Sequence, residues 1–597
     1  MRFLIITFFL LRVTCFSQSV DIYNTPASER VAFALYTVND NVLKLTAQCH
    51  PLINADDIHI DLEIEQNGEW KVVASSKIIY PGFTAPFRVD NWDDTREVNY
   101  RVNWQNKSYY EGIIRKNPID RSTFKVAAFS CNALNPRFGG DHSRQDIVDN
   151  VLKLSPDLLF FSGDQVYDHK MHLRDWLKFG RDFGELLRQY PTVCLTDDHD
   201  VGHYNIWGNG GTVSESIAGS DGGYFMSAEY VKEVERAQMS HLPDPYDPRP
   251  IGQGIGVSFT DLTWGGVSFA ILEDRKFKSP PMGNVPDLDG GRIDHITTSD
   301  YDPNDLDVKG LNLLGDRQLA FLDHWVQDWS GAEMKAVLSQ TIFTNAATVH
   351  GQTDNVLYAD MDANGWPQTG RNEALKRIRK AFAIHIAGDQ HLATFLQHGI
   401  DEFGDASYSF CVPAIANLYQ RWWMPLKTGL NSESSDGLFG DFHDGFGNKI
   451  TMMAVANPAF QDDDGEDRLL TRAAGWGLVE FDKANRTIKA HCWPRDVEVS
   501  EQNEYEGWPI VVNEERNYGR QRVGKLPELR FDVANPVVKV FDQEGNLVYA
   551  KRVNGSSFRP FVFEEGKCRL LIASELKQKE LILETGDKRK FVNVKLN

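Results

Sequence analysis

The sequence predicts an α/β fold with several domains, in which a mixed α and β central region lies between two β-rich ends. Residues 158–161, 192–195 and 384–387 are short apolar runs that end at glycine or acidic residues, which is typical of buried strands. Residues 124–162 have the order strand, helix, strand, and this βαβ unit favours a parallel sheet. At 597 residues, the chain is too long for one ordinary domain.

Residues 1–18 are predicted to be a secretory signal peptide. Arg2 gives a basic start, residues 3–11 form a short apolar core, and cleavage is expected near Ser17 or Gln18. A buried N-terminal helix is the alternative interpretation. The apolar core is too short to span a bilayer, and no other stretch is long and apolar enough. We therefore expect a secreted or periplasmic protein without a membrane span.

The two ends of the mature chain are predicted to be small β domains. Residues 20–117 alternate apolar and polar side chains with turn residues between the runs, which indicates a β-sandwich. The alternative is that these strands extend the central sheet. Residues 527–597 alternate in the same way and suggest a small C-terminal β domain. The region between them, residues 123–500, is the predicted central domain, and its acidic run at 462–467 is either a solvated loop or a calcium site.

Charge and cysteine content exclude some classes of partner. The formal net charge of −21 repels other polyanions, so no nucleic-acid-binding surface is expected. Six cysteines follow the signal peptide without a CxxC pair, which argues against a zinc knuckle and leaves one or two disulfides open. Cys131 differs from the others because it ends an apolar strand, where it could be a metal ligand. The oligomeric state has no sequence signal.

Polar clusters follow each predicted central strand, where the ends of parallel strands meet at one edge of a sheet. Carboxylate and phenol oxygens, imidazoles and one thiol would therefore come together, which is what a metal site needs. The sequence thus predicts a metal-dependent hydrolase. The four clusters are Cys-Asn at 131–132, Gly-Asp-x-x-Tyr at 163–167, Asp-Asp-His-Asp at 197–200 and Gly-Asp-x-His at 388–391.

Taken in this order, the four motifs resemble the alkaline phosphatase D (PhoD-like) metallophosphatases, a branch of the calcineurin-like metallophosphoesterase superfamily. Residues 272–276, 314–318 and 362–366 carry further signals of the same family, and the resemblance covers roughly residues 124–415. It implies a calcineurin-like β-sandwich core flanked by helices. It also implies that two or more metal ions take part in the hydrolysis of phosphate esters.

The resemblance implies that the first ion is iron. Its expected ligands are Cys131, Asp164, Tyr167 and His391, with Asp164 bridging to the second ion and Tyr167 as the tyrosinate ligand of ferric iron. Cys131 takes the place of the first Asp of most calcineurin-like enzymes, a departure that the PhoD-like branch shares. Iron tolerates a thiolate ligand.

The second ion is expected to contact Asp164, Asp198 and Asp389. Carboxylates stand here in place of the neutral ligands of the wider superfamily, which favours calcium, magnesium or manganese over zinc. The histidine that usually precedes the last motif has no counterpart at residues 338–341. The identity of the second ion therefore stays open.

Three further residues are candidates for contact with the substrate. His199 is expected to face the leaving group and to donate a proton to it, with Asp200 orienting the imidazole. Asn132 and Arg275 are candidates for binding phosphate oxygens, and structural roles are equally open for both.

Three hypotheses follow. The leading one is a secreted binuclear phosphoesterase of the alkaline phosphatase D type, in which metal-bound hydroxide attacks a phosphate ester. The second is a secreted β-domain binding or adhesion protein with a degenerate phosphatase scaffold. The third is a phosphodiesterase of the same fold. A degenerate site would have lost one of Asp164, Asp198, Asp389 or His391, and all four are present.

Overall fold

The computed structural model describes most of the chain. The described residues are 22, 24–53, 57–135, 139–288, 291–351, 355–417, 419–432, 437–460 and 471–597. The predicted signal peptide and the acidic run at 462–467 lie outside the described residues. Among those that are described, no helix is both long and apolar enough to cross a membrane.

Residues 31–114 form two antiparallel sheets with strand orders β1-β2-β5 and β4-β3-β6-β7. They share one core, in which Leu45 and Leu62 are fully buried. Within the described residues, these strands pair only with one another, so they do not extend a central sheet. The strands are β1 Val31–Asn39, β2 Val42–Cys49, β3 His59–Gln66, β4 Glu69–Lys77, β5 Thr84–Val89, β6 Val98–Trp104 and β7 Ser108–Ile114.

The first central sheet has the strand order β10-β9-β8-β24-β25-β26, with β20 beside β8. β8, β9 and β10 are parallel neighbours, and helix α1 connects the first two, as the βαβ pattern predicts. The late strands β24 and β25 complete the sheet in antiparallel pairing. The bounds are β8 Thr123–Asn132, β9 Leu158–Phe161, β10 Thr192–Cys194, β20 Ala414–Ala416, β24 Gly475–Asp482, β25 Thr487–Pro494 and β26 Ile510–Asn513.

The second central sheet has the order β11-β12-β14-β17-β19-β18-β23-β22. Its middle strands β12, β14, β17 and β19 are parallel, and antiparallel strands complete both edges. Both central sheets are therefore mixed. The bounds are β11 Thr260–Trp264, β12 Val267–Ile271, β14 Met334–Thr341, β17 Ile384–Gly388, β18 Ala393–His398, β19 Tyr408–Cys411, β22 Gly440–His443 and β23 Lys449–Ala456.

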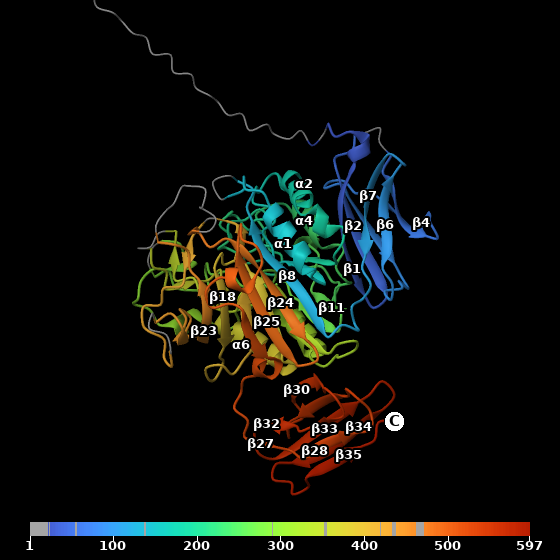
Figure 1. Ribbon diagram of the computed structural model, residues 1–597. Helices are drawn as coiled ribbons and strands as arrows, with labels where there is room; N and C mark the ends of the chain where they lie inside the picture. The colour runs from blue at the N-terminus through green and yellow to red at the C-terminus, as the bar shows by residue number, and fades with distance from the viewer. Residues whose placement is uncertain are drawn as a thin grey trace, which may run out of the picture.

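The two central sheets pack on each other, and Phe129 of β8 and Ile386 of β17 belong to one buried core. Helices cover the outside of this pair: Figure 1 shows α1, α2 and α4 near β8 and the N-terminal sheets. Trp325 of α5 and Ile378 of α6 pack on the second sheet. The helices are α1 Gln145–Leu154, α2 His172–Asp182, α3 Gly184–Leu187, α4 Ala228–Met239, α5 Gly315–Trp325 and α6 Gln368–Ile378.

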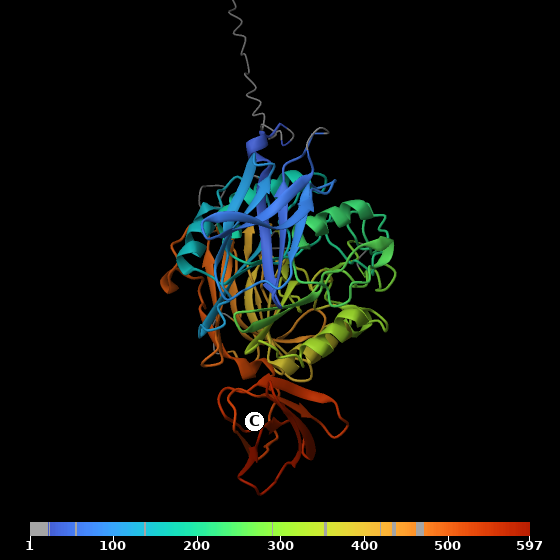
Figure 2. The ribbon, with the colours of Figure 1, turned by 90° about the vertical axis from the view of Figure 1, so that its right-hand side faces the viewer.

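The C-terminal residues form three small sheets at the opposite end of the molecule from β4 and β6 (Figures 1 and 2). Their core contains Val540 and Leu570, and Phe382 and Tyr518 of the preceding chain pack into it. The alternating segments of the C-terminal sequence are strands, as predicted. They are β27 Gly524–Lys525, β28 Glu528–Phe531, β29 Val537–Phe541, β30 Leu547–Arg552, β31 Ser557–Phe558, β32 Phe561–Val562, β33 Lys567–Ala573, β34 Gln578–Glu584 and β35 Phe591–Val594.

Two pairs of very short strands lie in the loops of the central region. β13 (His295–Ile296) pairs with β16 (Ala359–Asp360), and β15 (Val349–His350) pairs with β21 (Arg421–Trp422). No disulfide bond joins the sheets in the described part of the chain. All six described cysteines are free and buried, namely Cys49, Cys131, Cys194, Cys411, Cys492 and Cys568.

Candidate metal centre

The ends of three central strands meet in one place. β8 and β9 are neighbours in the first central sheet, and β17 belongs to the second. The amide of Asn132 donates a hydrogen bond to the carbonyl of Asp164 at 2.8 Å, which joins the ends of β8 and β9. Across the two sheets, the amide of Asp389 donates to Oγ of Ser130, also at 2.8 Å. Backbone groups therefore hold the three strand ends together.

Four of the predicted metal ligands have a backbone conformation that residues other than glycine rarely adopt. The angle φ is 53° at Cys131, 61° at Asp164, 67° at Asp389 and 52° at His391. Left-handed backbone is costly for such residues and is found preferentially at functional sites, where the surrounding structure holds it in place. The local backbone therefore supports a functional role for these four residues.

Gly163 and Gly388 allow the strand ends to approach closely. A Cβ atom at Gly388 would lie 2.2 Å from Oγ of Ser130 and 2.4 Å from Oγ of Ser162. A Cβ atom at Gly163 would lie 2.6 Å from Cβ of Asp197. Contacts this short cannot be accommodated without movement, so the glycine that precedes each aspartate is required by packing.

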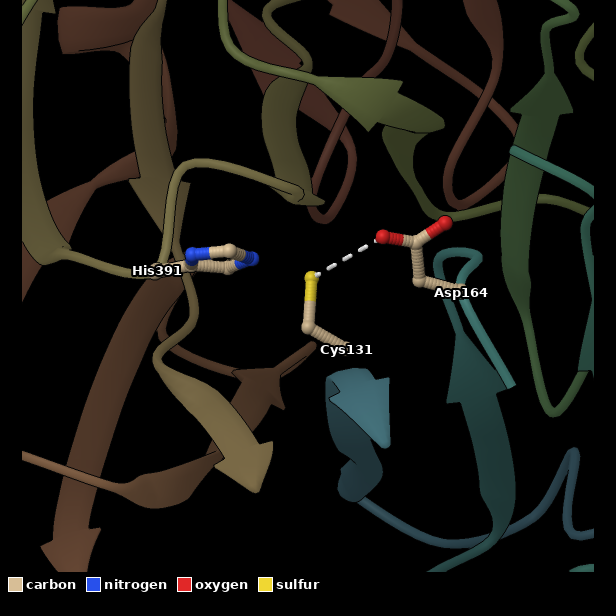
Figure 3. A group of neighbouring side chains, drawn as sticks. All are labelled: Cys131, Asp164 and His391. Carbon is tan, nitrogen blue, oxygen red and sulfur yellow. Dashed lines mark hydrogen bonds between the residues drawn. The ribbon is translucent and has the colours of Figure 1, made fainter. Parts of the chain in front are cut away.

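Cys131, Asp164 and His391 form the first candidate metal group, and their ligand atoms lie within 4.8 Å of one another. Figure 3 shows the sulfur of Cys131 between the imidazole of His391 and the carboxylate of Asp164, whose Oδ2 is 3.7 Å away. Burial raises the pKa of the Cys131 thiol well above its usual value, and Asp164 raises it further. A bound cation would therefore be needed to stabilise the thiolate.

Tyr167 adjoins this first group. Its hydroxyl donates to Oδ2 of Asp164 at 2.8 Å and accepts a hydrogen bond from Nδ2 of Asn417 at 3.1 Å. Burial raises the pKa of Tyr167 well above its usual value, and the charge of Asp164 adds to this effect. Asn417 follows β20 and was not predicted, because an isolated asparagine outside the motifs gives no sequence signal.

Asp197, Asp198 and Asp389 form the second candidate metal group, again with ligand atoms within 4.8 Å. Asp164 also lies within this range of Asp198, so it borders both groups. Burial raises the pKa of Asp198 well above its usual value, and Asp164 raises it further. Oδ1 of Asp198 is buried and has no hydrogen-bond partner in the described part of the chain. A partnerless carboxylate oxygen among other carboxylates fits a cation ligand.

His199 lies against Tyr167 and His169. Its Nδ1 atom is 2.8 Å from Nε2 of His169, and its ring stacks on Tyr167 with a centroid distance of 4.2 Å. Burial lowers the pKa of His199 well below its usual value, and His169 lowers it further. The imidazole is therefore neutral in this structure, whereas the predicted transfer of a proton to the leaving group needs the protonated form. His169 was not predicted as its partner.

Asp200 does not orient His199, contrary to the sequence-based expectation. Its Oδ2 atom accepts hydrogen bonds from the amides of Asp164 at 2.7 Å and Asp197 at 3.0 Å. Its Oδ1 atom accepts from the amide of Val166 at 3.0 Å. Asp200 therefore ties the turn after β9 to the turn after β10.

Arg275 lies inside the carboxylate cluster, where its contacts favour the structural role that the sequence left open beside phosphate binding. It is 4% exposed, and its Nε atom is 2.8 Å from Oδ1 of Asp197. Its Nη1 atom is 2.8 Å from Oδ1 of Asp362, and its Nη2 atom is 2.9 Å from Oδ2 of Asp389. With all three nitrogens engaged, Arg275 offsets the charge of the carboxylates and holds Asp389 in place.

Asn132 keeps a free donor next to Cys131. Its Oδ1 atom accepts a hydrogen bond from Nε of Arg144 at 2.7 Å, which fixes the orientation of the amide. Its Nδ2 atom is buried and has no partner among the residues that the structure describes. Asn132 is therefore still a candidate donor to a phosphate oxygen.

Arg421 is a candidate for phosphate binding that the sequence did not reveal. Its Nε and Nη1 atoms are buried and have no hydrogen-bond partner within the described ranges. Although burial lowers its pKa, the charges of Asp389 and Asp360 raise that pKa overall. Its own charge lowers the pKa of His391. A guanidinium with free N–H groups beside the candidate metal groups is suited to a phosphate oxygen.

Comparison with known proteins gives a match to one family model and to solved structures. Residues 172–416 match the family model of the PhoD-like phosphatases. Comparison with curated proteins gave no match. Among solved structures, that of PhoD aligns with a TM-score of 0.52 and 14% identity, over 82% of this chain and 90% of that one. A purple acid phosphatase from seeds of yellow lupin (Lupinus luteus) aligns with a TM-score of 0.48 and 12% identity, over 80% of this chain and 74% of that one.

The matched segment contains His199, Arg275, Asp389 and His391, and the resemblance inferred from the motifs is confirmed. At 14% identity, the likeness to PhoD concerns the fold. Residues 172–416 are therefore similar to the PhoD-like phosphatases, and the protein is a hydrolase that acts on phosphoric ester bonds.

Proposed function

We propose that this protein is an exported, binuclear metal-dependent phosphoesterase. The observation that supports it best is the position of Asp164 beside two candidate metal groups, one with Cys131 and His391 and one with Asp198. A carboxylate shared in this way is suited to bridging two ions. Export rests on the predicted signal peptide at residues 1–18. The proposed organisation is an N-terminal β-sandwich at 20–117, a catalytic domain at 123–500 and a C-terminal β domain at 527–597.

The donor atoms differ between the two groups, so we assign different ions to them. Thiol, phenol, imidazole and carboxylate donors from Cys131, Tyr167, His391 and Asp164 suit iron. The second group offers carboxylates, which suits calcium, magnesium or manganese better than zinc. Its buried acids carry more negative charge than the single guanidinium of Arg275 offsets, which supports a metal ion at this position.

The ions would activate a water molecule and offset the charge on the phosphate oxygens. The chain itself supplies the groups that bind and orient the ester. Nδ2 of Asn132 and the free N–H groups of Arg421 are the proposed donors to phosphate oxygens. The pair His169–His199 is proposed to donate a proton to the leaving group. Nε2 of His169 and Nδ1 of His199 share one hydrogen bond, through which a proton can be passed on. Arg275 is proposed as a positioning residue, since it acts through Asp389.

The proposal is tested by hydrolysis of nitrophenyl phosphate monoesters and diesters, together with total metal analysis of the purified protein. We expect hydrolysis and at least two ions per chain in the wild type. In Asp164→Asn we expect no hydrolysis and loss of the ions of the main centre. Asp168→Asn is a matched control, since Asp168 pairs with Arg174 at 2.8 Å and is partly exposed. Full activity and full metal content in Asp164→Asn would refute the assignment. The ratio of monoester to diester activity decides between the phosphatase and the phosphodiesterase alternative.

A further inference from the structure

A separate group of possible ligands lies in the short loop strands. His295 of β13 is paired with Asp360 of β16, and His350 of β15 is paired with Arg421 of β21. The ligand atoms of His295, His350 and Asp360 lie within 4.8 Å of one another. None of these three residues belongs to the motifs that predicted the main centre.

The geometry of this loop group is that of ligands around a shared point. Nε2 of His350 is 3.8 Å from Oδ2 of Asp360, and Nε2 of His295 is 3.9 Å from Oδ1 of the same carboxylate. These distances are too long for hydrogen bonds. An ion with bonds of about 2.0–2.2 Å to each ligand would require only a small contraction of the group.

His350 has an unsatisfied nitrogen directed at this group. The residue is 2% exposed, and its Nε2 atom has no hydrogen-bond partner among the described residues. The backbone of Ala347 interacts with the imidazole, and metal-binding histidines are commonly oriented by such a partner outside the ligand shell. Asp360 is 1% exposed, and its Oδ1 atom accepts a hydrogen bond from the amide of Asp362 at 3.0 Å.

An ordinary ion pair does not explain the group. His350 and His295 are 3.8 Å and 3.9 Å from the carboxylate of Asp360, which is farther than in a hydrogen-bonded ion pair. Imidazole in its neutral form is a common metal ligand. Asp294 is less available as a ligand, because Asn205 donates to its Oδ2 atom at 3.0 Å and Arg292 also pairs with it.

We propose that His295, His350 and Asp360 bind an additional metal ion of the zinc class, distinct from the ions of the main centre. Two imidazoles and one carboxylate are donors that suit zinc or a similar first-row ion, whereas calcium and magnesium prefer oxygen ligands alone. Three protein ligands leave the fourth position of a tetrahedral ion to water or to an anion.

The loop group is connected to the main centre through one chain of contacts. The amide of Asp362 donates to Oδ1 of Asp360 at 3.0 Å, and the side chain of Asp362 binds Arg275. Arg275 in turn holds Asp389. Occupation of the loop group by a cation would therefore stabilise the loop that supports Asp362, and with it the second metal group.

The test uses Zn²⁺ and Co²⁺ as probes of the full-length protein in the Asp164→Asn background, where the main centre is disabled. We expect this variant to bind one Zn²⁺ per chain, and to show with Co²⁺ the visible absorption of a four-coordinate site with nitrogen ligands. His350→Gln in this background should weaken Zn²⁺ binding by at least about 100-fold, because loss of groups outside the ligand shell alone costs about 10- to 100-fold.

His295→Gln is the second variant, since His295 is partly exposed and tolerates replacement better than the buried His350. His59→Gln is the matched control, because His59 is exposed on β3 in the N-terminal sheets. Circular dichroism establishes that each variant is folded. Unchanged Zn²⁺ affinity in either folded variant, or no Zn²⁺ bound to Asp164→Asn, would overturn the proposal. Phosphoester hydrolysis and its loss in Asp164→Asn are measured separately from Zn²⁺ binding by the loop group, so the two proposals fail separately.

Discussion

Tyr167 donates its hydroxyl hydrogen to Oδ2 of Asp164 across 2.8 Å, on the same oxygen that faces the sulfur of Cys131. The other carboxylate oxygen, Oδ1, accepts the backbone amide of His199 at 3.3 Å. The two oxygens of Asp164 therefore contact different segments of the chain, Oδ2 the end of β8 and Oδ1 the turn after β10. This division is what a carboxylate between two ions requires.

Replacement of Tyr167 by phenylalanine should remove the colour of a ferric protein. A phenolate bound to ferric iron donates charge to the metal and absorbs visible light, while the phenyl ring can still stack on His199. We expect the visible band to be bleached or shifted in Tyr167→Phe, with the fold retained. Absorption spectra and iron analysis measure this. Tyr80→Phe is the control, since Tyr80 is 78% exposed. An active wild type with zinc, no iron and no colour would contradict the iron assignment.

Gly388→Ala should destabilise the protein and empty the metal centre. The added methyl group would lie 2.2 Å from Oγ of Ser130, which itself binds the amide of Asp389. We expect a loss of about 1–3 kcal/mol in the free energy of unfolding, as is usual for overpacking. Urea unfolding and metal analysis provide the measurement. Gly184→Ala is the control, because a Cβ atom there would meet nothing within 4 Å. Equal stability of both variants would show that the space between Gly388 and Ser130 can accommodate a methyl group.

The sequence predicted the site residues that directly follow apolar central strands. It missed site residues whose strands are placed by pairing with segments far away in the chain. Asp164 and Asp389 were identifiable because an apolar run and a glycine precede each of them. Arg421 and Asn417 were not, because they lie on or after very short strands whose position is set by partners far away in the chain. The sequence left two roles open for Arg275, since its contacts with Asp362 and Asp389 depend on the tertiary structure.

The mixed character of the sheets has the same cause. The βαβ pattern correctly gave parallel β8 and β9, which are close in sequence. On its other side, β8 pairs in antiparallel fashion with β24, where Gly477 lies opposite Ala128. Local periodicity describes each of these strands, but the choice of neighbour depends on packing of the whole domain.

His199→Ala should lower turnover without removing the ions, if the imidazole serves the leaving group. The loss should be greatest for esters with poor leaving groups, where proton transfer matters most. His169→Gln should also lower kcat, by less than His199→Ala does, and should change the pH profile of kcat, because Nε2 of His169 contacts Nδ1 of His199. Rates with nitrophenyl and alkyl phosphates and metal analysis test this. Loss of a metal ion from His199→Ala would instead identify His199 as a ligand, beside Asp164 and Asp198.

Buried neutral histidines should make the metal-free protein sensitive to acid. Burial lowers the pKa of both His241 and His385 to about 3, from the usual 6.5. At pH values between about 3 and 6.5, the two histidines bind protons in the unfolded chain but not in the folded chain. Their stabilising contribution is therefore complete above about pH 6.5 and is lost as the pH falls from there toward 3, with a slope of about 1.4 kcal/mol per pH unit for each histidine.

His241→Gln isolates this effect, because glutamine can still donate to the carbonyl of Thr192, which His241 contacts at 2.9 Å. We expect the free energy of unfolding to fall less steeply with acidification in this variant than in the wild type, by about 1.4 kcal/mol per pH unit. Urea titrations of the metal-free proteins at about pH 7, 6 and 5 measure the slope. The exposed His59→Gln variant should keep the wild-type slope. Parallel slopes for His241→Gln and the wild type would show that His241 takes up a proton in the folded state.

Arg421→Gln and Arg275→Gln should have opposite consequences, because only one of these arginines has its nitrogens engaged. Arg275 contacts Asp197, Asp362 and Asp389, so its loss leaves buried carboxylates uncompensated. We expect Arg275→Gln to lower the free energy of unfolding by about 3–5 kcal/mol and to lose the second ion.

In Arg421, Nε and Nη1 have no partner in the described structure and are free to bind phosphate. One or two charge-assisted hydrogen bonds of about 1.5–3 kcal/mol in total correspond to a rise in KM of roughly 10- to 100-fold in Arg421→Gln, with the fold and both ions retained. Inhibition by inorganic phosphate should weaken by the same factor, because phosphate would contact the same guanidinium. Steady-state kinetics, phosphate inhibition and urea unfolding of both variants measure these effects. If Arg275→Gln raised KM in a stable protein while Arg421→Gln lost its ions, the roles of the two arginines would be reversed.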